Sequence, residues 1–250
     1  TGGDWHEAAD VYRAYAGREP IFIYLVALST TLLGPTVFAI RVVAALVGVS
    51  TVLAAYLFAR RPFGPATALA GSAMLAVLYW HVHTSRLGFR AILVPLLLTI
   101  TLAVLWHAVG TGRARWYVIA GIFGGLTFYT YNAARFAAVL TVAFVLLQAV
   151  LNRRWLLDRW RKLGLAALAL AVVVTPLALY FAQYPDDFFI RASQTTFLSP
   201  QAIGGNPLAT LAESTWRTLA MFSYQGDWVV KYNLPGKPVF DLAASALFYA

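Results

Sequence analysis

The sequence has no cysteine, and its acidic residues are confined to two stretches. Without cysteine, disulfides, thiol catalysis and thiolate metal sites are excluded. Nine of the ten acids lie in residues 4–19 and 186–241, and Asp158 is the only acid between them. A soluble domain needs charges of both signs over its whole surface. The long interval with a single acid therefore predicts a protein embedded in a membrane.

Apolar residues fill that interval. Hydrophobic residues make up 60% of the chain, charged residues 12%, and the mean hydropathy is +0.69, which is outside ordinary globular usage. A membrane-spanning helix needs about 20 mostly apolar residues. Runs of about that length predict six spans, and a seventh run begins near Val239. The six runs cover residues 36–59, 66–83, 91–109, 116–131, 136–151 and 163–183.

The first apolar run, residues 21–33, is too short to cross a bilayer because Gly34-Pro35 interrupts it. It is typical of an interfacial or re-entrant helix. The chain opens at Thr1 without a methionine, and its last run, residues 242–250, is short. We therefore expect an internal fragment of a larger membrane protein.

The basic residues orient the spans. The loops after alternate spans hold nine basic residues and one acid, Asp158, which the positive-inside rule assigns to the cytoplasm. The opposite, extracytoplasmic side then carries residues 1–35 and the long segment 184–238. The predicted fold is all-α: a single polytopic helical bundle with six spans in residues 36–183, one large outer loop, and a shortened span in residues 239–250.

Two groups of residues near the outer ends of the first spans could hold a phosphate. Arg18 and Glu19 stand directly before Pro20 and a helix start, where a guanidinium and the helix dipole both favour an anion. The same residues could simply anchor a helix start at the headgroups. Arg86 and Arg90 lie in one short outer loop, and their partner is either a lipid phosphate or an acid such as Glu19.

Two further groups could meet a sugar. Tyr131, Asn132 and Arg135 end the fourth run; they could contact a sugar or phosphate, or belong to the aromatic belt at the membrane surface. Asp227 and Lys231 lie in the large outer loop, where they could recognise an acceptor, close over a donor, or be ordinary solvated charges.

Signatures of other functions are missing from the sequence. It contains no Walker-type loop, no G-x-S-x-G, no H-E-x-x-H and no dinucleotide fingerprint. His81 and His83 do not share a helical face and have no nearby third ligand, so they predict no metal site. No cofactor is predicted, and the sequence does not indicate whether a divalent metal is required. The predicted spans are nearly bare of charge, whereas a coupled transporter usually places ionisable groups within them.

Several motifs, in this order, resemble the GT-C superfamily of membrane glycosyltransferases. The nearest branch looks like the dolichyl-phosphate-mannose protein mannosyltransferases and the bacterial aminoarabinose transferases. The motifs that carry the likeness are Gly17-Arg18-Glu19-Pro20-Ile21-Phe22-Ile23-Tyr24-Leu25, Ala39-Ile40-Arg41, Tyr56-Leu57-Phe58-Ala59-Arg60 with Phe63-Gly64, Ser85-Arg86-Leu87-Gly88-Phe89-Arg90, Tyr129-Thr130-Tyr131-Asn132-Ala133-Ala134-Arg135, and Gly226-Asp227 with Tyr232-Asn233-Leu234-Pro235-Gly236.

The resemblance implies transfer of a sugar from a polyprenyl-phosphate donor to a protein, lipid or glycan acceptor. It implies a bacterial or archaeal plasma membrane enzyme with its site on the extracytoplasmic face. Arg18 matches a basic or polar position of the family, and Arg86, Arg90 and Arg135 are implied phosphate or sugar contacts. The family's catalytic acid follows a first spanning helix that this chain lacks, so we expect that base upstream of residue 1 and an inactive fragment. The alternative is a polyprenyl-lipid flippase or another polytopic transporter.

Overall fold

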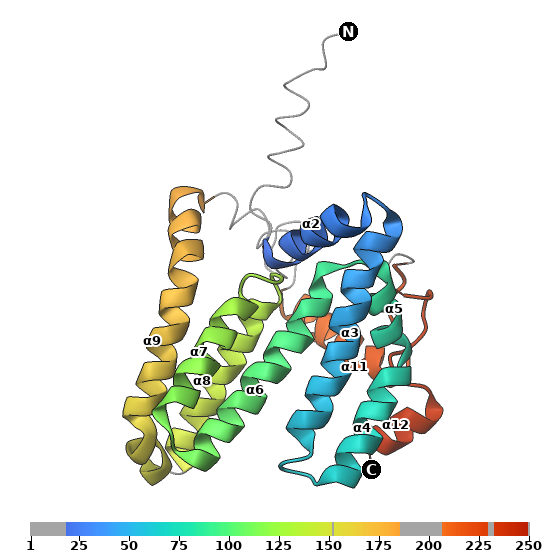
Figure 1. The fold of residues 1–250 in the computed structure, drawn as a ribbon. Helices are drawn as coiled ribbons and strands as arrows, with labels where there is room; N and C mark the ends of the chain where they lie inside the picture. Colours follow the sequence, from blue (N-terminus) through green and yellow to red (C-terminus); the bar gives the residue numbers. More distant parts are fainter. Residues whose placement is uncertain (1–18, 152, 186–206, 230–232, 250) are drawn as a thin grey trace. The chain divides into compact units, whose positions relative to one another are not determined.

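A computed structural model describes residues 19–151, 153–185, 207–229 and 233–249, and throughout this part of the chain the regular structure is helical, with no strand (Figure 1). The all-α prediction is therefore confirmed for these residues. The elements are α2 (Ile21–Leu33), α3 (Val37–Ala59), α4 (Pro65–Val77), α5 (Tyr79–Leu87), the 3-10 turn η1 (Arg90–Ile92), α6 (Leu93–Thr111), α7 (Ala114–Thr127), α8 (Ala134–Leu151), α9 (Arg153–Gln183), α11 (Pro207–Ser223) and α12 (Leu242–Tyr249).

The described residues fall into two compact units. The larger unit comprises residues 18–76 and 85–180, and it contains α2, α3, α6, α7 and α8 together with nearly all of α4 and α9. The smaller unit includes residues 77–84 and 181–250, and it contains α11, α12 and most of α5.

The sequence explains the turn from α2 to α3. Gly34 takes a positive φ of 81°, a conformation that glycine adopts without strain, and Pro35 cannot continue a helix. Thr36 then caps α3 by accepting a hydrogen bond from the Ala39 backbone N–H at 3.2 Å. The buried Ser29 hydroxyl donates to the Ala39 carbonyl at 2.7 Å, which ties α2 to the start of α3.

The core of the larger unit lies where α2 meets α3 and the start of α6. Phe22 of α2 packs with Val43, Ala44 and Val47 of α3 and with Ile92 and Leu93. In Figure 1, α2 lies across the ends of α3 and α6, and α6 runs between α3 and α7. The short apolar helix is therefore held by burial against two long helices.

Close backbone approach joins α7 to α9. A Cβ added at Gly121 would lie 2.1 Å from the Ala166 carbonyl oxygen, and one at Gly125 would lie 2.7 Å from the Val173 Cβ. The Tyr129 hydroxyl donates a hydrogen bond to the Val173 carbonyl at 2.7 Å just beyond the end of α7. Glycine is thus required on the α7 face that contacts α9.

Three helices are long and apolar enough to cross a membrane, within the part of the chain that the structure describes: Val37–Ala59, Arg90–Thr111 and Leu156–Gln183. A fourth is added if α4 and α5 count as one bent span. The predicted run at 66–83 is thus two helices, broken at Leu78 where the sequence changes from apolar to histidine-rich and polar. The run at 116–131 is helical only to Thr127.

In the smaller unit, α11 and α12 pack together through an aromatic cluster. Phe222 lies 5.9 Å from Phe240 and 5.7 Å from Phe248, measured between ring centroids. The backbone N–H groups of Val239 and Phe240 donate to the carbonyls of Met221 and Phe222, so the chain after residue 233 returns along the end of α11.

Candidate functional site

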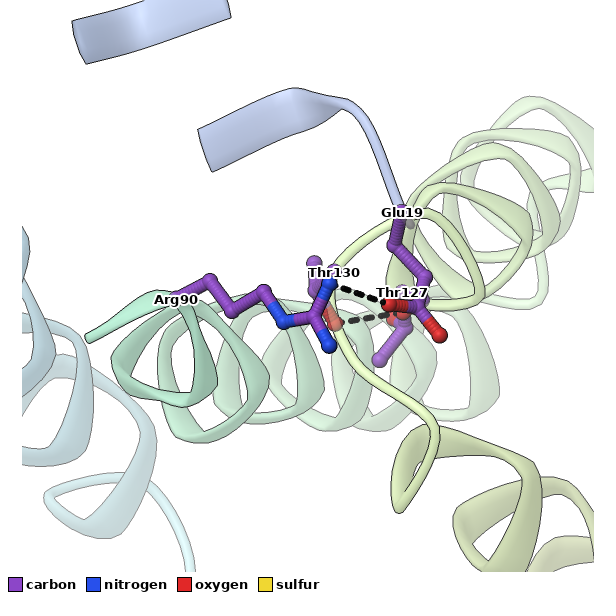
Figure 2. A network of polar contacts seen from close by, with 4 residues as sticks. All are labelled: Glu19, Arg90, Thr127 and Thr130. Carbon is purple, nitrogen blue, oxygen red and sulfur yellow. Dashed lines mark hydrogen bonds and ion pairs between the residues drawn. The ribbon is translucent and has the colours of Figure 1, made fainter. Parts of the chain in front are cut away.

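An ion pair in the larger unit joins Glu19 to Arg90 (Figure 2). Glu19 stands before Pro20 and α2, and Arg90 opens the 3-10 turn that leads into α6. The Arg90 Nη1 lies 3.1 Å from the Glu19 Oε2, and the two side chains are 13% and 2% exposed. The sequence left two partners possible for Arg90, a lipid phosphate or an acid such as Glu19. In the structure Arg90 pairs with Glu19.

The ring of Tyr131 forms a second wall around the same guanidinium. The Arg90 Cζ lies 5.2 Å from the centroid of that ring, within the range of a cation–π contact. Phe89 meets Tyr131 edge to face, with their centroids 5.5 Å apart. Arg90 is therefore positioned by a carboxylate and an aromatic ring together.

The turn after α7 brings Tyr131 to this place. The buried Thr130 hydroxyl donates to the Thr127 carbonyl at 2.6 Å, closing the turn, and both threonines lie beside the ion pair in Figure 2. The Ile21 N–H donates to the Tyr129 carbonyl at 3.3 Å, so the first residue of α2 is bonded to the same turn.

Gly88 sets the direction of the Arg90 segment. It ends α5 with a φ of +69°, and a Cβ there would lie 2.8 Å from the Ile40 Cγ2. Glycine is favoured just past a helix end for this reason, since other residues are strained at positive φ. The backbone of Gly88 thus lies against α3. From there the chain continues to Phe89 and Arg90, whose side chains both contact the ring of Tyr131.

The Glu19 carboxylate is buried beside Arg90. No group in the described ranges donates a hydrogen bond to either carboxylate oxygen of Glu19, although both oxygens are buried. A buried carboxylate is costly unless it is paired, and the nearby Arg90 supplies the opposite charge. The pair therefore fixes one guanidinium just before α6.

The other predicted site residues are distributed around this pair or apart from it. Asn132 and Arg135 are half-buried in the same turn and at the start of α8, and the Arg135 N–H donates to the Asn132 carbonyl at 3.2 Å. Arg86 is exposed in the last turn of α5. Asp227 belongs to the smaller unit. Arg18 and Lys231 lie outside the described residues.

Comparison with known proteins assigns the part of the chain that holds the ion pair. Residues 17–179 match the dolichyl-phosphate-mannose-protein mannosyltransferase family. The chain belongs to this family. The match includes Glu19, Arg90 and Tyr131, and it ends before α11 and Asp227. Membership, with the long apolar helices, also establishes a helical membrane protein.

Two curated relatives of this mannosyltransferase-family chain come from two strains of Pseudomonas aeruginosa. Each is an undecaprenyl phosphate-alpha-4-amino-4-deoxy-L-arabinose arabinosyl transferase, 30% and 29% identical over 187 residues. The matches cover 71% of this chain and 33% of each relative, so the chain spans about a third of their length. No solved structure matches the chain.

Sequence reasoning did not single out Thr127, Thr130 or Phe89 as parts of the site. These residues support Tyr131 and carry no charge that would draw attention in a sequence. Glu19, Arg90 and Tyr131 come from three of the motifs that the sequence offered. Their mutual contact depends on how the helices pack.

Proposed function

We propose that this chain is part of a glycosyltransferase that moves a sugar from a polyprenyl-phosphate donor to an acceptor at the extracytoplasmic membrane face. The observation that carries the proposal is the Arg90 guanidinium, held by Glu19 and Tyr131 at the start of α6 within the family segment. A cation fixed at the end of an apolar helix suits a phosphate whose lipid tail lies in the bilayer.

The chemistry is a displacement at the anomeric carbon. The acceptor's nucleophilic atom forms a bond to that carbon, and the bond from the carbon to the phosphate oxygen breaks. Negative charge grows on the departing polyprenyl phosphate, where Arg90 and the exposed Arg86 supply positive charge. A general base takes the acceptor's proton. The names of the relatives make an undecaprenyl-phosphate-linked sugar the first donor to test.

The distribution of charge in the described helices supports an enzyme over a transporter. The single charged residue of α3 is Arg41, near the start of the helix. In α9 the charged residues occupy the first three turns, and the rest of the helix carries none. Ionisable groups inside the spans are typical of coupled transporters. We propose that the full topology is the one expected from the sequence, with six spans and residues 184–238 on the outer side.

An assay of the complete gene product tests this function. The protein, in proteoliposomes, receives a radiolabelled undecaprenyl-phosphate sugar together with lipid, glycan or protein acceptors. Covalent transfer of label to an acceptor is the expected result, and Arg90→Lys, which keeps a positive charge beside Glu19, should reduce transfer at limiting donor. Movement of intact donor across the bilayer, with no transfer to any acceptor, would instead assign the protein to lipid transport.

A further inference from the structure

The smaller unit contains a cavity of about 610 Å³ between α11 and the turn that follows it. This volume is within the range of small-molecule sites. Its walls include two tryptophans, a methionine, an ion pair and a further acid: Trp216, Trp228, Met221, Glu213 with Arg217, and Asp227. We propose that the cavity is a sugar-binding subsite, which takes a carbohydrate ring of the donor or of the acceptor. This inference rests on the proposed glycosyltransferase function.

The two tryptophans supply the surface that a sugar ring requires. Trp216 is 66% exposed and Trp228 is 64% exposed, and both line the cavity. An indole combines a flat apolar face with an N–H donor, so it can cover the C–H face of a sugar and hydrogen-bond to a hydroxyl.

Polar groups of both signs complete the lining. Glu213 and Arg217 form an ion pair one helical turn apart, so their charges offset each other. Asp227 contributes a further carboxylate, whose Oδ1 accepts a hydrogen bond from the Val229 N–H at 3.0 Å. These side chains give the wall a net charge of −1. The cavity therefore favours a neutral or amine-bearing sugar over an acidic one.

The turn that carries Asp227 and Trp228 is fixed before any ligand arrives. Asn233 is 1% exposed, and its Nδ2 donates to the carbonyls of Asp227 and Lys237 at 2.9 and 2.7 Å. A Cβ on Gly226 would lie 1.8 Å from the Lys237 carbonyl oxygen, so only glycine fits there. A preformed wall loses little conformational entropy when a ligand binds.

Helical spacing places the ion pair of this wall away from the exposed leucines of α11, and Trp216 lies between the two, about 60° from Leu219. Glu213 and Arg217 share one face, whereas the exposed Leu211 and Leu219 lie about 120–160° away around the helix at about 100° per residue. If α11 rests on a membrane surface, the leucine face is the one that meets lipid. The cavity face, with its charges, remains available to a polar ligand.

Saturation-transfer NMR on the complete gene product in lipid nanodiscs tests the inference without needing turnover. The probes are the methyl glycosides of 4-amino-4-deoxy-L-arabinose, mannose and glucuronic acid. The first two should bind at least ten times more tightly than the glucuronide. Trp216→Ala should weaken their binding at least fivefold. Asp227→Asn should reduce the preference for the amino sugar over the glucuronide at least fivefold, because it removes the negative charge. The turn should be kept, because the Asn side-chain oxygen can still accept the hydrogen bond from the Val229 N–H.

Trp160→Ala on α9, which is 58% exposed, is the matched control and should leave binding unchanged. If the Trp216→Ala and Trp160→Ala variants bound the methyl glycosides with equal affinity, the inference would be overturned. A Trp216→Ala effect on association with anionic lipid and none on sugar would also overturn it, because it would mark a membrane contact. Sugar binding without any transfer would count against the proposed function alone. Competition by undecaprenyl-phosphate sugar identifies a donor ring, and competition only by an acceptor glycan identifies an acceptor ring.

Discussion

Glu19 and Arg90 form an ion pair in which the Glu19 side chain is 2% exposed and the Arg90 side chain 13%. The contact joins the residue before Pro20 to the turn that opens α6, so two distant parts of the chain depend on it. An ion pair this buried differs from a surface pair, because removing one member leaves the other charge with little access to water.

We predict that Glu19→Gln destabilises the protein by about 3 kcal/mol, the lower end expected for breaking a buried pair, because Arg90 keeps some exposure. The Gln side chain has nearly the shape of Glu but no charge to balance the guanidinium. Thermal unfolding in detergent measures the effect. Replacing both residues, as Glu19→Met with Arg90→Met, should recover most of the lost stability, because no unpaired charge remains.

Glu213→Gln is the matched control. Its partner Arg217 and Glu213 itself are 77% and 61% exposed, so this pair is screened by water. The same chemical change should cost less than about 1 kcal/mol. Equal destabilisation by both variants would contradict the view that burial makes the Glu19–Arg90 contact important.

A second prediction concerns the ring beside Arg90. Tyr131→Leu and Arg90→Lys should each raise the donor KM about tenfold in the complete gene product and also lower kcat, because Arg90 faces the phosphate both before and during its departure. Leu removes the π face, and Lys loses the planar guanidinium that lies 5.2 Å from it. Tyr131→Phe keeps the ring and should bind donor nearly as wild type. Steady-state transfer kinetics at varied donor concentration measure all three.

Arg60→Lys controls for the loss of an arginine–aromatic contact in general. Arg60 lies over the ring of Tyr56 at 5.8 Å, at the other end of α3 from the α2 contact. This variant should transfer sugar with unchanged donor KM. A donor KM raised as much by Arg60→Lys as by Arg90→Lys would remove the reason to assign Arg90 to the site.

Helices with sharp sequence boundaries were among those predicted well. The run at 21–33 is helix Ile21–Leu33, because Pro20 and Gly34-Pro35 delimit it, and the run at 36–59 is helix Val37–Ala59 after the Thr36 cap. The run at 66–83 has no proline or glycine near Leu78, and the change to more polar residues there did not by itself predict the break between α4 and α5.

The candidate site could be predicted only as separate segments. Charge and motif order pointed to Glu19, Arg90 and Tyr131 one by one. Their contact depends on Gly88 lying against Ile40 and on the Ile21–Tyr129 hydrogen bond, which are tertiary features. The early end of α7 has the same origin, because the turn after Thr127 is held by contacts with α2 and α9. Residue spacing carries no information on such long-range contacts.

A third prediction tests the turn at Gly88. Gly88→Ala forces a positive φ on alanine and sets its Cβ 2.8 Å from the Ile40 Cγ2. The backbone strain costs about 1 kcal/mol and the overpacking a further ~1–3 kcal/mol. We expect a matching fall in unfolding free energy and reduced transfer, since Arg90 follows two residues later.

Gly64→Ala separates strain from crowding. Gly64 has a φ of +83° with nothing within 4 Å of its built Cβ, so this variant should show the strain of about 1 kcal/mol alone. Adding Ile40→Ala to Gly88→Ala removes the crowded side chain. The double variant should then lose about as much unfolding free energy as Gly64→Ala. No recovery in the double variant would show that crowding against α3 is not the cause.

The last prediction distinguishes a substrate-binding arginine from a structural one. Arg86 is exposed in the last turn of α5, so Arg86→Ala should leave the unfolding free energy within about 0.5 kcal/mol of wild type. If Arg86 contacts the donor phosphate, as we propose, Arg86→Ala should raise the donor KM at least tenfold. The difference in KM between the variant and wild type should become smaller at high salt. Arg113→Ala, an exposed arginine just before α7, is the matched control and should change neither quantity. Unchanged kinetics for Arg86→Ala beside a clear loss for Arg90→Lys would restrict the phosphate contact to the arginine that Glu19 holds.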